Sequence, residues 1–582
     1  MGTENITMED RIETAIRNTQ DLYLSDTLPW VVGYSGGKDS TATLQLIWKA
    51  VSALPTDKRS KPIHVISTDT LVENPVVAIW VTNSLAAMQK AAQEQEMPIF
   101  PHRLTPKVED RFWVNLIGKG YPAPRPLFRW CTSRLKINAS NTFITELANN
   151  QGEAILVLGS RKAESNARDK VLARYENSTR ELLSRNADAN LDRVWVYTPV
   201  STWTSDDVWE YLIESENPWN YDNIELFHIY RGATPDAECP LVVDKSTPSC
   251  GDSRFGCFVC TMVSEDKSMQ AMIQNDEDRR WMMPLLNFRN EFLKTKGDRD
   301  LREFTKMDGS LQLQYLGMKS GERAAPSSRQ GKIVGEKVVK RLTENSIDEE
   351  GYPLPNRKVL VLETRVVEVD GEMRETTYKI EKIATLVHGP YTQKYRETML
   401  EELLRAQETI RGNLPESVSE FSIITPEELE EIRRLWVIQK REFEDSVPDI
   451  YLRATGRSYP SPELDETTPF RPDDIRLLRE VCMEMAIDAT QSGPLDSKQM
   501  LFNVLREQLG IQHGYRGAIR RVGLHSELED VLEMRSFENE DQALDFALQR
   551  KSGGNELMYE MRDASDVFAY IPEEQMAQEL EA

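Results

Sequence analysis

The segment WVVGYSGGKDS, residues 30–40, decides the fold. Its apolar start, Trp30–Tyr34, has the length and character of a buried strand, and two glycines then allow a sharp turn. After the turn, apolar residues recur at the i, i+3, i+4 and i+7 spacing of one helix face: Leu44, Ile47, Trp48 and Val51. Strand, glycine turn and helix in this order predict an α/β fold with a mostly parallel sheet and flanking helices.

Further apolar runs of strand length follow, at Ile63–Ser67, Ile155–Leu158 and Val194–Val200. Helical patterns fill the intervals between them, which is the alternation expected for a parallel sheet. Another helix is predicted to start near Ser205, where hydroxyl and carboxylate groups can cap free N–H groups. Its buried face is expected to consist of Val208, Trp209, Leu212 and Ile213.

The glycine turn has the composition of a phosphate-binding loop. Gly36 and Gly37 let several backbone N–H groups point at one anion, and the following helix adds its positive N-terminal end. Lys38 adds a cation, and Ser35 and Ser40 add hydroxyls. The spacing differs from the Walker loop, which has four residues between its glycines. The alternative is a glycine turn without a ligand, which the position between a strand and a helix disfavours.

Two further segments are placed to complete a nucleotide site. Asp69 follows the second predicted strand, at the edge where open α/β sheets bind ligands, and could orient a ribose or Mg²⁺ or act as a simple cap. The segment GSRKAES begins after the next strand, and its Gly159, Arg161 and Glu164 suit close backbone approach and phosphate contacts. A surface salt-bridge cluster is the alternative for this segment.

The chain has six cysteines, too few for a disulfide scaffold, and the cytoplasm is the expected location. Four of them fall within 22 residues and indicate a metal site: Cys239, Cys250, Cys257 and Cys260. Structural zinc usually takes two close pairs, whereas an iron-sulfur cluster tolerates irregular spacing, so the spacing alone leaves both open. Cys482 is expected in a helical core. The six histidines show no metal-like spacing and no visible dyad.

These motifs resemble known enzymes. SGGKDS, GSRKAES and the stretch from Pro199 to Pro218 resemble the phosphoadenosine phosphosulfate (PAPS) reductase-like branch of the ATP pyrophosphatases, which cleave ATP between its α and β phosphates and adenylate a substrate. More narrowly, STDTLVENP, FRWCTSRLKI, PSCGDSRFGCFVC and HGPYTQKYR resemble the DndC family of bacterial DNA phosphorothioation systems. The resemblance runs from about residue 10 to 460.

The resemblance implies ATP, Mg²⁺ and a [4Fe-4S] cluster on Cys239, Cys250, Cys257 and Cys260. It also implies DNA as the substrate, a cysteine desulfurase as the sulfur donor and other Dnd-type phosphorothioation subunits as partners. The nucleotide would be held by Ser35, Gly36, Gly37, Lys38, Asp39, Ser40, Asp69, Gly159, Arg161 and Glu164. The residues expected to take part in catalysis are Lys38, Asp39, Cys131 and Arg161.

Cys131 stands where PAPS reductase-like proteins often carry a cysteine. Arg129, Arg134 and Lys136 are near it in sequence and are expected to favour its thiolate, as a sulfur carrier or nucleophile requires. A buried cysteine without a chemical role is the alternative. Two other functions stay open: a PAPS reductase-like or RNA-thiolating enzyme, and a non-catalytic iron-sulfur assembly subunit.

The length of 582 residues exceeds one core, and at 40% hydrophobic and 29% charged residues the chain is not disordered as a whole. We predict a PP-loop ATP pyrophosphatase domain (1–235), a Cys-rich segment with helices (236–318), a basic linker with a small β region (319–395) and a helical region with an acidic tail (396–582). No apolar run is long enough to cross a membrane. The net charge of -24 argues against a stand-alone nucleic-acid binder.

The second half of the chain carries three local signals. Residues 319–341 hold seven Lys or Arg against two Glu, and are either a solvated linker or an arm that contacts nucleic acid. Asp370-Gly371, between the runs Val359–Val369 and Thr376–Ile380, predicts a hairpin. From about Glu397 helical faces follow: Leu400, Leu403 and Leu404, then Leu429, Ile432, Leu435 and Trp436.

Overall fold

A computed structural model describes most of the first 461 residues and two short segments beyond them. The described ranges are 7–125, 128–162, 182–185, 191, 193–233, 255–294, 299–307, 311–318, 355–369, 372–439, 445–461, 539–552 and 557–559. They form two compact units, which we treat separately. The first falls within Met1–Leu116, Ala123–Lys294 and Glu401–Glu431, and the second within Ile117–Pro122, Thr295–Leu400 and Ile432–Ala582.

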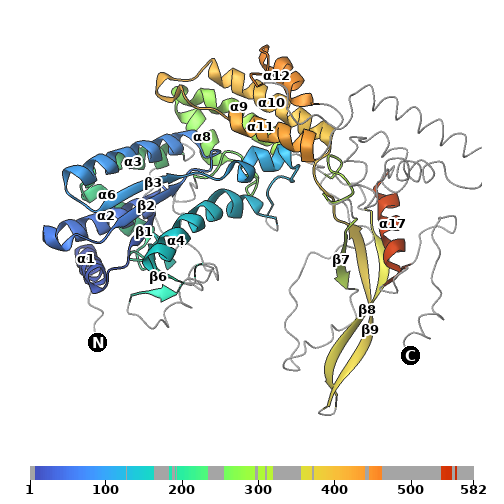
Figure 1. Cartoon of the computed structure of the whole chain (residues 1–582), viewed down its shortest axis with the longest axis horizontal. Helices are drawn as coiled ribbons and strands as arrows, with labels where there is room; N and C mark the ends of the chain where they lie inside the picture. The colour runs from blue at the N-terminus through green and yellow to red at the C-terminus, as the bar shows by residue number, and fades with distance from the viewer. Residues whose placement is uncertain are drawn as a thin grey trace, which may run out of the picture. The chain divides into compact units, whose positions relative to one another are not determined.

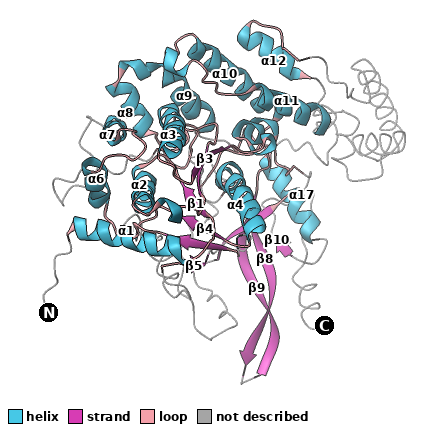
Figure 2. Cartoon of the chain, turned by 60° about the vertical axis from the view of Figure 1, so that its left-hand side comes forward, coloured by secondary structure: helices cyan, strands magenta, loops and turns pink. Residues whose placement is uncertain are grey.

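The first unit is built on a six-stranded sheet in the order β3-β2-β1-β4-β6-β5. Figure 2 labels β1, β3, β4 and β5 of this sheet and draws the strands in magenta. In that order the strands are Ile99–Leu104, Ile63–Thr68, Trp30–Gly33, Ala154–Val157, Val194–Tyr197 and Ser184–Arg185. The first five run parallel, and β5 is antiparallel to β6. The chain leaves β1 toward β2 on one side and later returns to β4 on the other, which makes the β1/β4 boundary the switch point of a doubly wound sheet.

Helices cover both faces of this sheet (Figure 1). One face packs against α1 (Met8–Ser25), α2 (Lys38–Ser52), α3 (Pro75–Glu94), α6 (Ser205–Glu214) and α7 (Asn223–Gly232). The opposite face packs against α4 (Asn138–Gln151) through Ile144 and Ala148. The predicted fold class, an α/β domain with a mostly parallel sheet and flanking helices, is confirmed.

Helices also make up the rest of the first unit. They include α8 (Lys267–Asn275), α9 (Met283–Phe288), the C-terminal part of α10 (Gln393–Arg411) and the N-terminal part of α11 (Pro426–Arg434). Short 3-10 and π helices of this unit are η1 (Thr56–Lys58), η2 (Val108–Asp110), the start of η3 (Val114–Gly118), η4 (Thr132–Ile137), η9 (Glu277–Met282), η10 (Arg289–Leu293) and η11 (Glu416–Val418), whereas η12 (Leu435–Gln439) belongs to the second unit. The predicted apolar faces at Leu400–Leu404 and Leu429–Trp436 are buried, as expected.

The second unit contains an antiparallel sheet in the order β10-β8-β9-β7. Its strands in that order are Leu557–Tyr559, Arg357–Val369, Glu372–Leu386 and Leu313–Met318. The predicted hairpin is confirmed by the pairing of Val369 with Glu372, although Asp370-Gly371 themselves lie outside the described residues. Besides α12 (Ser446–Thr455), the unit holds α17 (Glu540–Ser552), whose Asp541 and Asp545 pair with Arg357 at 2.7 and 2.8 Å.

In the sheet of the first unit, the four predicted strands are present as β1, β2, β4 and β6, whereas β3 and β5 were not predicted. One expectation for α6 is wrong: Ile213 is 41% exposed, and Tyr211 is buried in its place. Val208, Tyr211 and Leu212 follow the i, i+3, i+4 spacing of one stripe, and Ile213 falls beside it.

Within the described part of the chain, no helix combines the length and the apolar character needed to span a membrane. The basic stretch 319–341 and Cys482 lie outside the described residues.

Candidate functional site

The predicted phosphate loop connects β1 to α2, beside the switch point of the sheet. Gly36 has a φ of +73°, and a Cβ there would lie 2.3 Å from the Val81 side chain, so only glycine fits. Trp80 fixes the same residue, because its indole Nε1–H donates to the Gly36 carbonyl at 3.1 Å. The loop therefore takes its shape from the packing of α3 against it.

The hydroxyls of the loop close it internally. The Ser35 N–H donates to the Ser40 Oγ at 3.2 Å, the two hydroxyl oxygens lie 3.1 Å apart, and the Ser40 hydroxyl donates to the Gly37 carbonyl at 3.0 Å. α2 then starts at Lys38, and its N-cap Gly37 has no side chain to satisfy the first N–H groups. Such a helix start is suited to an anion.

Three charged side chains meet at this loop: Lys38, Asp39 and Arg161. Arg161 lies 122 residues after Asp39 in the chain. The Arg161 guanidinium is buried and donates to Asp39 Oδ1 at 2.6 Å. The Lys38 ammonium lies 3.8 Å from Asp39 Oδ2. Burial lowers the pKa of Lys38, and the Asp39 carboxylate opposes that shift. The Asp39 carboxylate thus lies between the Lys38 ammonium and the Arg161 guanidinium and keeps the Lys38 charge beside the loop.

Gly159 brings the segment after β4 into contact with the loop. A Cβ on this residue would lie 2.7 Å from the Asp39 carbonyl oxygen and 3.0 Å from the Ser40 nitrogen. The close backbone approach expected for this glycine is present, and it joins both sides of the switch point. Glu164 lies outside the described residues.

Asp69 has local partners in the structure. Its Oδ1 accepts a hydrogen bond from the Leu71 N–H at 2.8 Å, and its Oδ2 pairs with Arg103. These contacts form a turn after β2 and an ion pair with β3. The expected role in holding a ribose or Mg²⁺ stays a prediction.

The cysteine segment is attached to the loop that follows β2. Cys257 pairs with Glu73 as an isolated β-bridge, the Phe258 N–H donates to the Val72 carbonyl at 3.0 Å, and the Asn74 N–H donates to the Gly256 carbonyl at 3.2 Å. This attachment carries the segment to the carboxyl edge of the sheet, next to the strand that precedes the phosphate loop.

Cys257 and Cys260 are free thiols in a tight turn, in which the Cys260 N–H donates to the Cys257 carbonyl at 3.0 Å. Such a turn is suited to two ligands of one metal centre. The other two expected ligands, Cys239 and Cys250, lie outside the described residues. Among the residues that are described, no group of three or more Cys, His, Asp or Glu side chains could hold a metal ion.

A partly exposed charged pair borders these thiols. The Lys136 ammonium donates to Glu73 Oε1 at 3.3 Å. Burial raises the pKa of Cys257 to about 11, and Lys136 opposes this shift. Burial also tends to lower the pKa of Lys136, but Cys257, Glu73 and Cys131 outweigh burial and raise it. Lys136 is therefore the cation shared by both cysteine positions.

Cys131 lies close enough to Cys260 and Lys136 for their charges to interact. The expectation that its thiolate is favoured is wrong for this structure, because burial raises the pKa of Cys131. Arg134, one of the cations expected to help, is turned toward Asp110, to which it donates at 2.6 Å.

Sequence reasoning missed several residues around the site. Arg289 is fully buried and donates to the carbonyls of Cys260 at 2.9 Å and Val263 at 2.6 Å, so it holds the cysteine turn. The sequence signal for this role is a single arginine in the mostly apolar run WMMPLLNFRNEFL. His64 and His102 form a dyad, with 3.0 Å between Nδ1 and Nε2, contrary to the expectation of none. Burial lowers the pKa of both.

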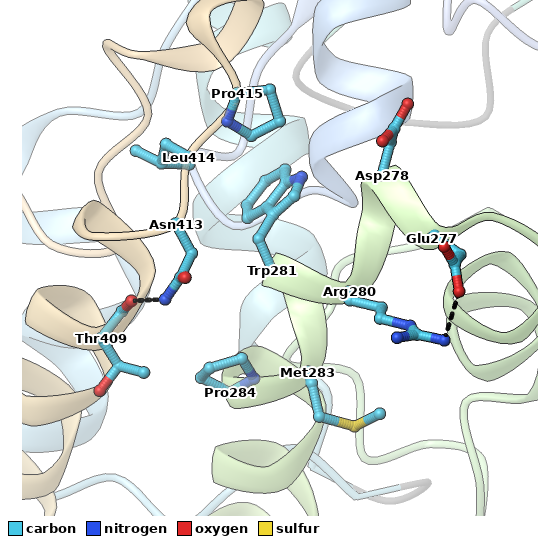
Figure 3. Close-up of a pocket in the computed structure, with 10 residues that line it drawn as sticks. All are labelled: Glu277, Asp278, Arg280, Trp281, Met283, Pro284, Thr409, Asn413, Leu414 and Pro415. Carbon is cyan, nitrogen blue, oxygen red and sulfur yellow. Dashed lines mark hydrogen bonds and ion pairs between the residues drawn. The ribbon is translucent and has the colours of Figure 1, made fainter.

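A cavity of about 640 Å³ lies elsewhere in the first unit, between Glu277–Pro284 and Thr409–Pro415. Figure 3 shows Trp281 in the middle of its wall, with the Glu277–Arg280 ion pair on one side and Asn413 bonded to Thr409 on the other. None of the residues expected to bind a nucleotide or a metal lines it.

The loop, the switch point and the sheet define an α/β domain with a candidate phosphate-binding loop. Residues 29–261 match the family model described as phosphoadenosine phosphosulfate reductase domain. The uncharacterized protein MJ0066 of Methanocaldococcus jannaschii is 27% identical over 205 residues, and the match covers 35% of each chain. The chain thus spans about a third of the length of this relative.

Two solved structures are similar at low identity. The phosphate complex of PAPS reductase from Candida auris is 14% identical, with 38% of this chain and 91% of that chain covered and a TM-score of 0.23. The U34-tRNA thiolase NcsA from Methanococcus maripaludis with its [4Fe-4S] cluster is 13% identical, with 49% and 80% covered and a TM-score of 0.24.

Proposed function

We propose that this chain is an ATP-dependent sulfurtransferase of DNA phosphorothioation, similar to the DndC family. One observation carries the proposal: a phosphate loop with a braced lysine and a cysteine turn belong to one folded unit, and the turn is paired with the loop that follows β2, the strand next to β1. The match of residues 29–261 to the PAPS reductase domain family supports nucleotide chemistry at this loop.

In the proposed reaction the ATP phosphates lie over the loop, with Mg²⁺, and Lys38 stabilises the charge that develops on the departing pyrophosphate. A nonbridging oxygen of a DNA backbone phosphate attacks the α-phosphorus, and pyrophosphate leaves. A sulfur nucleophile at the oxidation level of sulfide then displaces AMP, which carries the former phosphate oxygen. Adenylation is needed because a phosphate oxygen is otherwise a very poor leaving group.

The residues near the cysteine turn are compatible with a [4Fe-4S] cluster. Cys257 and Cys260 would supply two of its thiolates, and Cys239 and Cys250 are the other proposed ligands. When bound, the cluster would supply sulfur-transfer chemistry beside the nucleotide. Lys136 would balance part of the thiolate charge, and Arg289 would keep the turn in place through its backbone contacts.

The proposed partners follow from the same reaction. A cysteine desulfurase would donate the sulfur as a persulfide, and a thiol reductant would supply the two electrons that bring it to the level of sulfide. Other Dnd-type subunits would help to present DNA, because a net charge of -24 opposes binding of DNA by this chain alone. We place this reaction in the cytoplasm, where thiols stay reduced.

The first test is the product of ATP turnover by anaerobically purified protein, with iron and acid-labile sulfide assayed in the same sample. AMP and pyrophosphate are expected, and Lys38→Ala should abolish pyrophosphate release while the fold stays intact. Lys49→Ala is the matched control, because Lys49 belongs to the same helix and its ammonium likewise lies near a tyrosine ring, at 5.2 Å, but away from the loop. Pyrophosphate release by Lys38→Ala at the wild-type rate would refute the assignment.

The substrate needs its own measurement. Phosphorothioate dinucleotides detected by liquid chromatography in host DNA, and lost on deletion of this chain, would support DNA modification. Release of sulfite without ATP cleavage would indicate a reductase, and sulfur in RNA would indicate an RNA-thiolating enzyme. ADP, or no turnover at all, would favour a non-catalytic iron-sulfur assembly subunit.

A further inference from the structure

Tyr230, on α7, reaches the phosphate loop from outside the motif. Its ring is buried, with 7% of the residue exposed, and its hydroxyl accepts a hydrogen bond from the Lys38 N–H at 3.3 Å. A Cβ on Gly37 would lie 3.2 Å from the same oxygen. The Lys38 ammonium lies 5.5 Å from the center of the ring. The hydroxyl thus occupies the open start of α2, where an anion would bind.

The proton of this hydroxyl has no acceptor among the described residues. The phenol uses its oxygen to accept from Lys38, and no described group receives a hydrogen bond from it. Burial raises the pKa of Tyr230, so that the group stays neutral and keeps its proton at physiological pH. A buried donor without an acceptor is costly, and a phosphate oxygen at the loop would satisfy it.

The ring is held firmly enough to aim the hydroxyl. Trp209 packs against it edge to face at 5.0 Å, and Phe255 does the same from the cysteine segment at 4.6 Å. Phe255 precedes Cys257 by two residues. Tyr230 therefore contacts the phosphate loop with its hydroxyl and the cysteine segment with its ring.

We infer that Tyr230 is a further ligand of the nucleotide phosphates: its hydroxyl donates to a phosphate oxygen bound at the start of α2. The inference rests on the proposed function, since it needs a phosphate at the loop. It assigns a binding role to a residue that lies 190 positions after Ser40 and outside every motif of the loop.

The test uses the full chain and inorganic pyrophosphate, titrated by calorimetry. A hydrogen bond to a charged group contributes about 1.5–3 kcal/mol, so Tyr230→Phe should weaken pyrophosphate binding by roughly ten- to one-hundred-fold. The affinity for adenosine, which has no phosphate, should not change. Tyr211→Phe is the matched control, because that phenol is also buried and its hydroxyl has no hydrogen-bond partner among the described residues, but it does not touch the loop.

The outcomes separate this inference from the proposed function. If the wild type binds pyrophosphate and Tyr230→Phe binds it equally well, the inference fails and the proposed function stands. If the wild type binds neither ATP nor pyrophosphate, both fail. Equal loss of adenosine and pyrophosphate affinity in Tyr230→Phe would mean that the hydroxyl only supports the fold, and would also overturn the inference. A thermal midpoint close to that of the wild type verifies that the variant is folded.

Discussion

Gly159→Ala tests whether the contact between the two sides of the switch point positions the phosphate loop. The substitution removes no functional group and adds one methyl. That methyl would lie 2.7 Å from the Asp39 carbonyl oxygen and 2.8 Å from its carbon. Carbon contacts are ordinarily about 3.5 Å or longer, so the two backbone segments must separate by roughly 0.8 Å. Both atoms belong to backbone, and no side chain can rotate to make room.

Two effects of different size follow. Overpacking of this kind costs about 1–3 kcal/mol of unfolding free energy. A displacement near 1 Å of a positioning group can reduce a rate by about 100-fold. We therefore expect pyrophosphate release from ATP to fall by about 100-fold, with a modest loss of stability measured by urea unfolding. Pyrophosphate affinity, measured by calorimetry, should fall as well.

The control is Gly412→Ala, where the added methyl would meet backbone oxygens only at 3.8 and 3.9 Å, ordinary contact distances. This variant should turn over ATP like the wild type. If Gly159→Ala kept pyrophosphate release and pyrophosphate affinity within about twofold of wild type, the contact would have no part in positioning the loop. The reasoning from the backbone distances would then be refuted.

Three further predictions concern the charges of the first unit. Burial raises the pKa of Glu428 from 4.5 to about 7, so the unfolded chain ionises first as the pH rises. The free energy of unfolding should therefore fall by about 3 kcal/mol between pH 4.5 and pH 7. Glu428→Gln should remove most of the difference between urea unfolding at pH 5 and at pH 8. Burial lowers the pKa of His64 and His102 below 6.5, so the unfolded chain takes up protons first as the pH falls. The free energy of unfolding should therefore decrease below pH 6.5. His102→Gln should show a smaller decrease over the same pH range. Asp39→Asn should lower the free energy of unfolding by about 3 kcal/mol, because it removes the carboxylate that pairs with the buried Arg161 guanidinium, and an unchanged denaturant midpoint would contradict this.

The fold and the phosphate loop could be predicted because their signals are local. The apolar run, the glycines and the helix face of residues 30–51 are contiguous and describe one strand-turn-helix unit. β3 has no comparable signal, because Pro101, His102 and Arg103 interrupt its apolar pattern and the strand lies at the edge of the sheet. Once β3 is missed, the dyad of His64 and His102 cannot be seen, since it depends on the pairing of β2 with β3.

The site shows the same limit. Asp39 and Arg161 were both expected at the site from their own segments, but their ion pair depends on the β1/β4 pairing, which no spacing in the sequence encodes. The prediction of a favoured thiolate at Cys131 is wrong for a related reason. Three cations are near Cys131 in sequence, whereas in the structure Arg134 pairs with Asp110 and partial burial of the thiol raises its pKa.

The order of the strands explains how the phosphate loop and the cysteine turn come together. β2, β1 and β4 are neighbours and run parallel, so the loops that follow them leave the same edge of the sheet. The loop after β1 carries Lys38, the loop after β4 carries Arg161, and the loop after β2 is paired with Cys257. Tyr230 adds a second connection, because it touches the first of these loops and the segment that leads to the cysteine turn. A reaction that activates a phosphate with ATP and then delivers sulfur needs such an arrangement, since the adenylated intermediate must meet the sulfur nucleophile before it meets water.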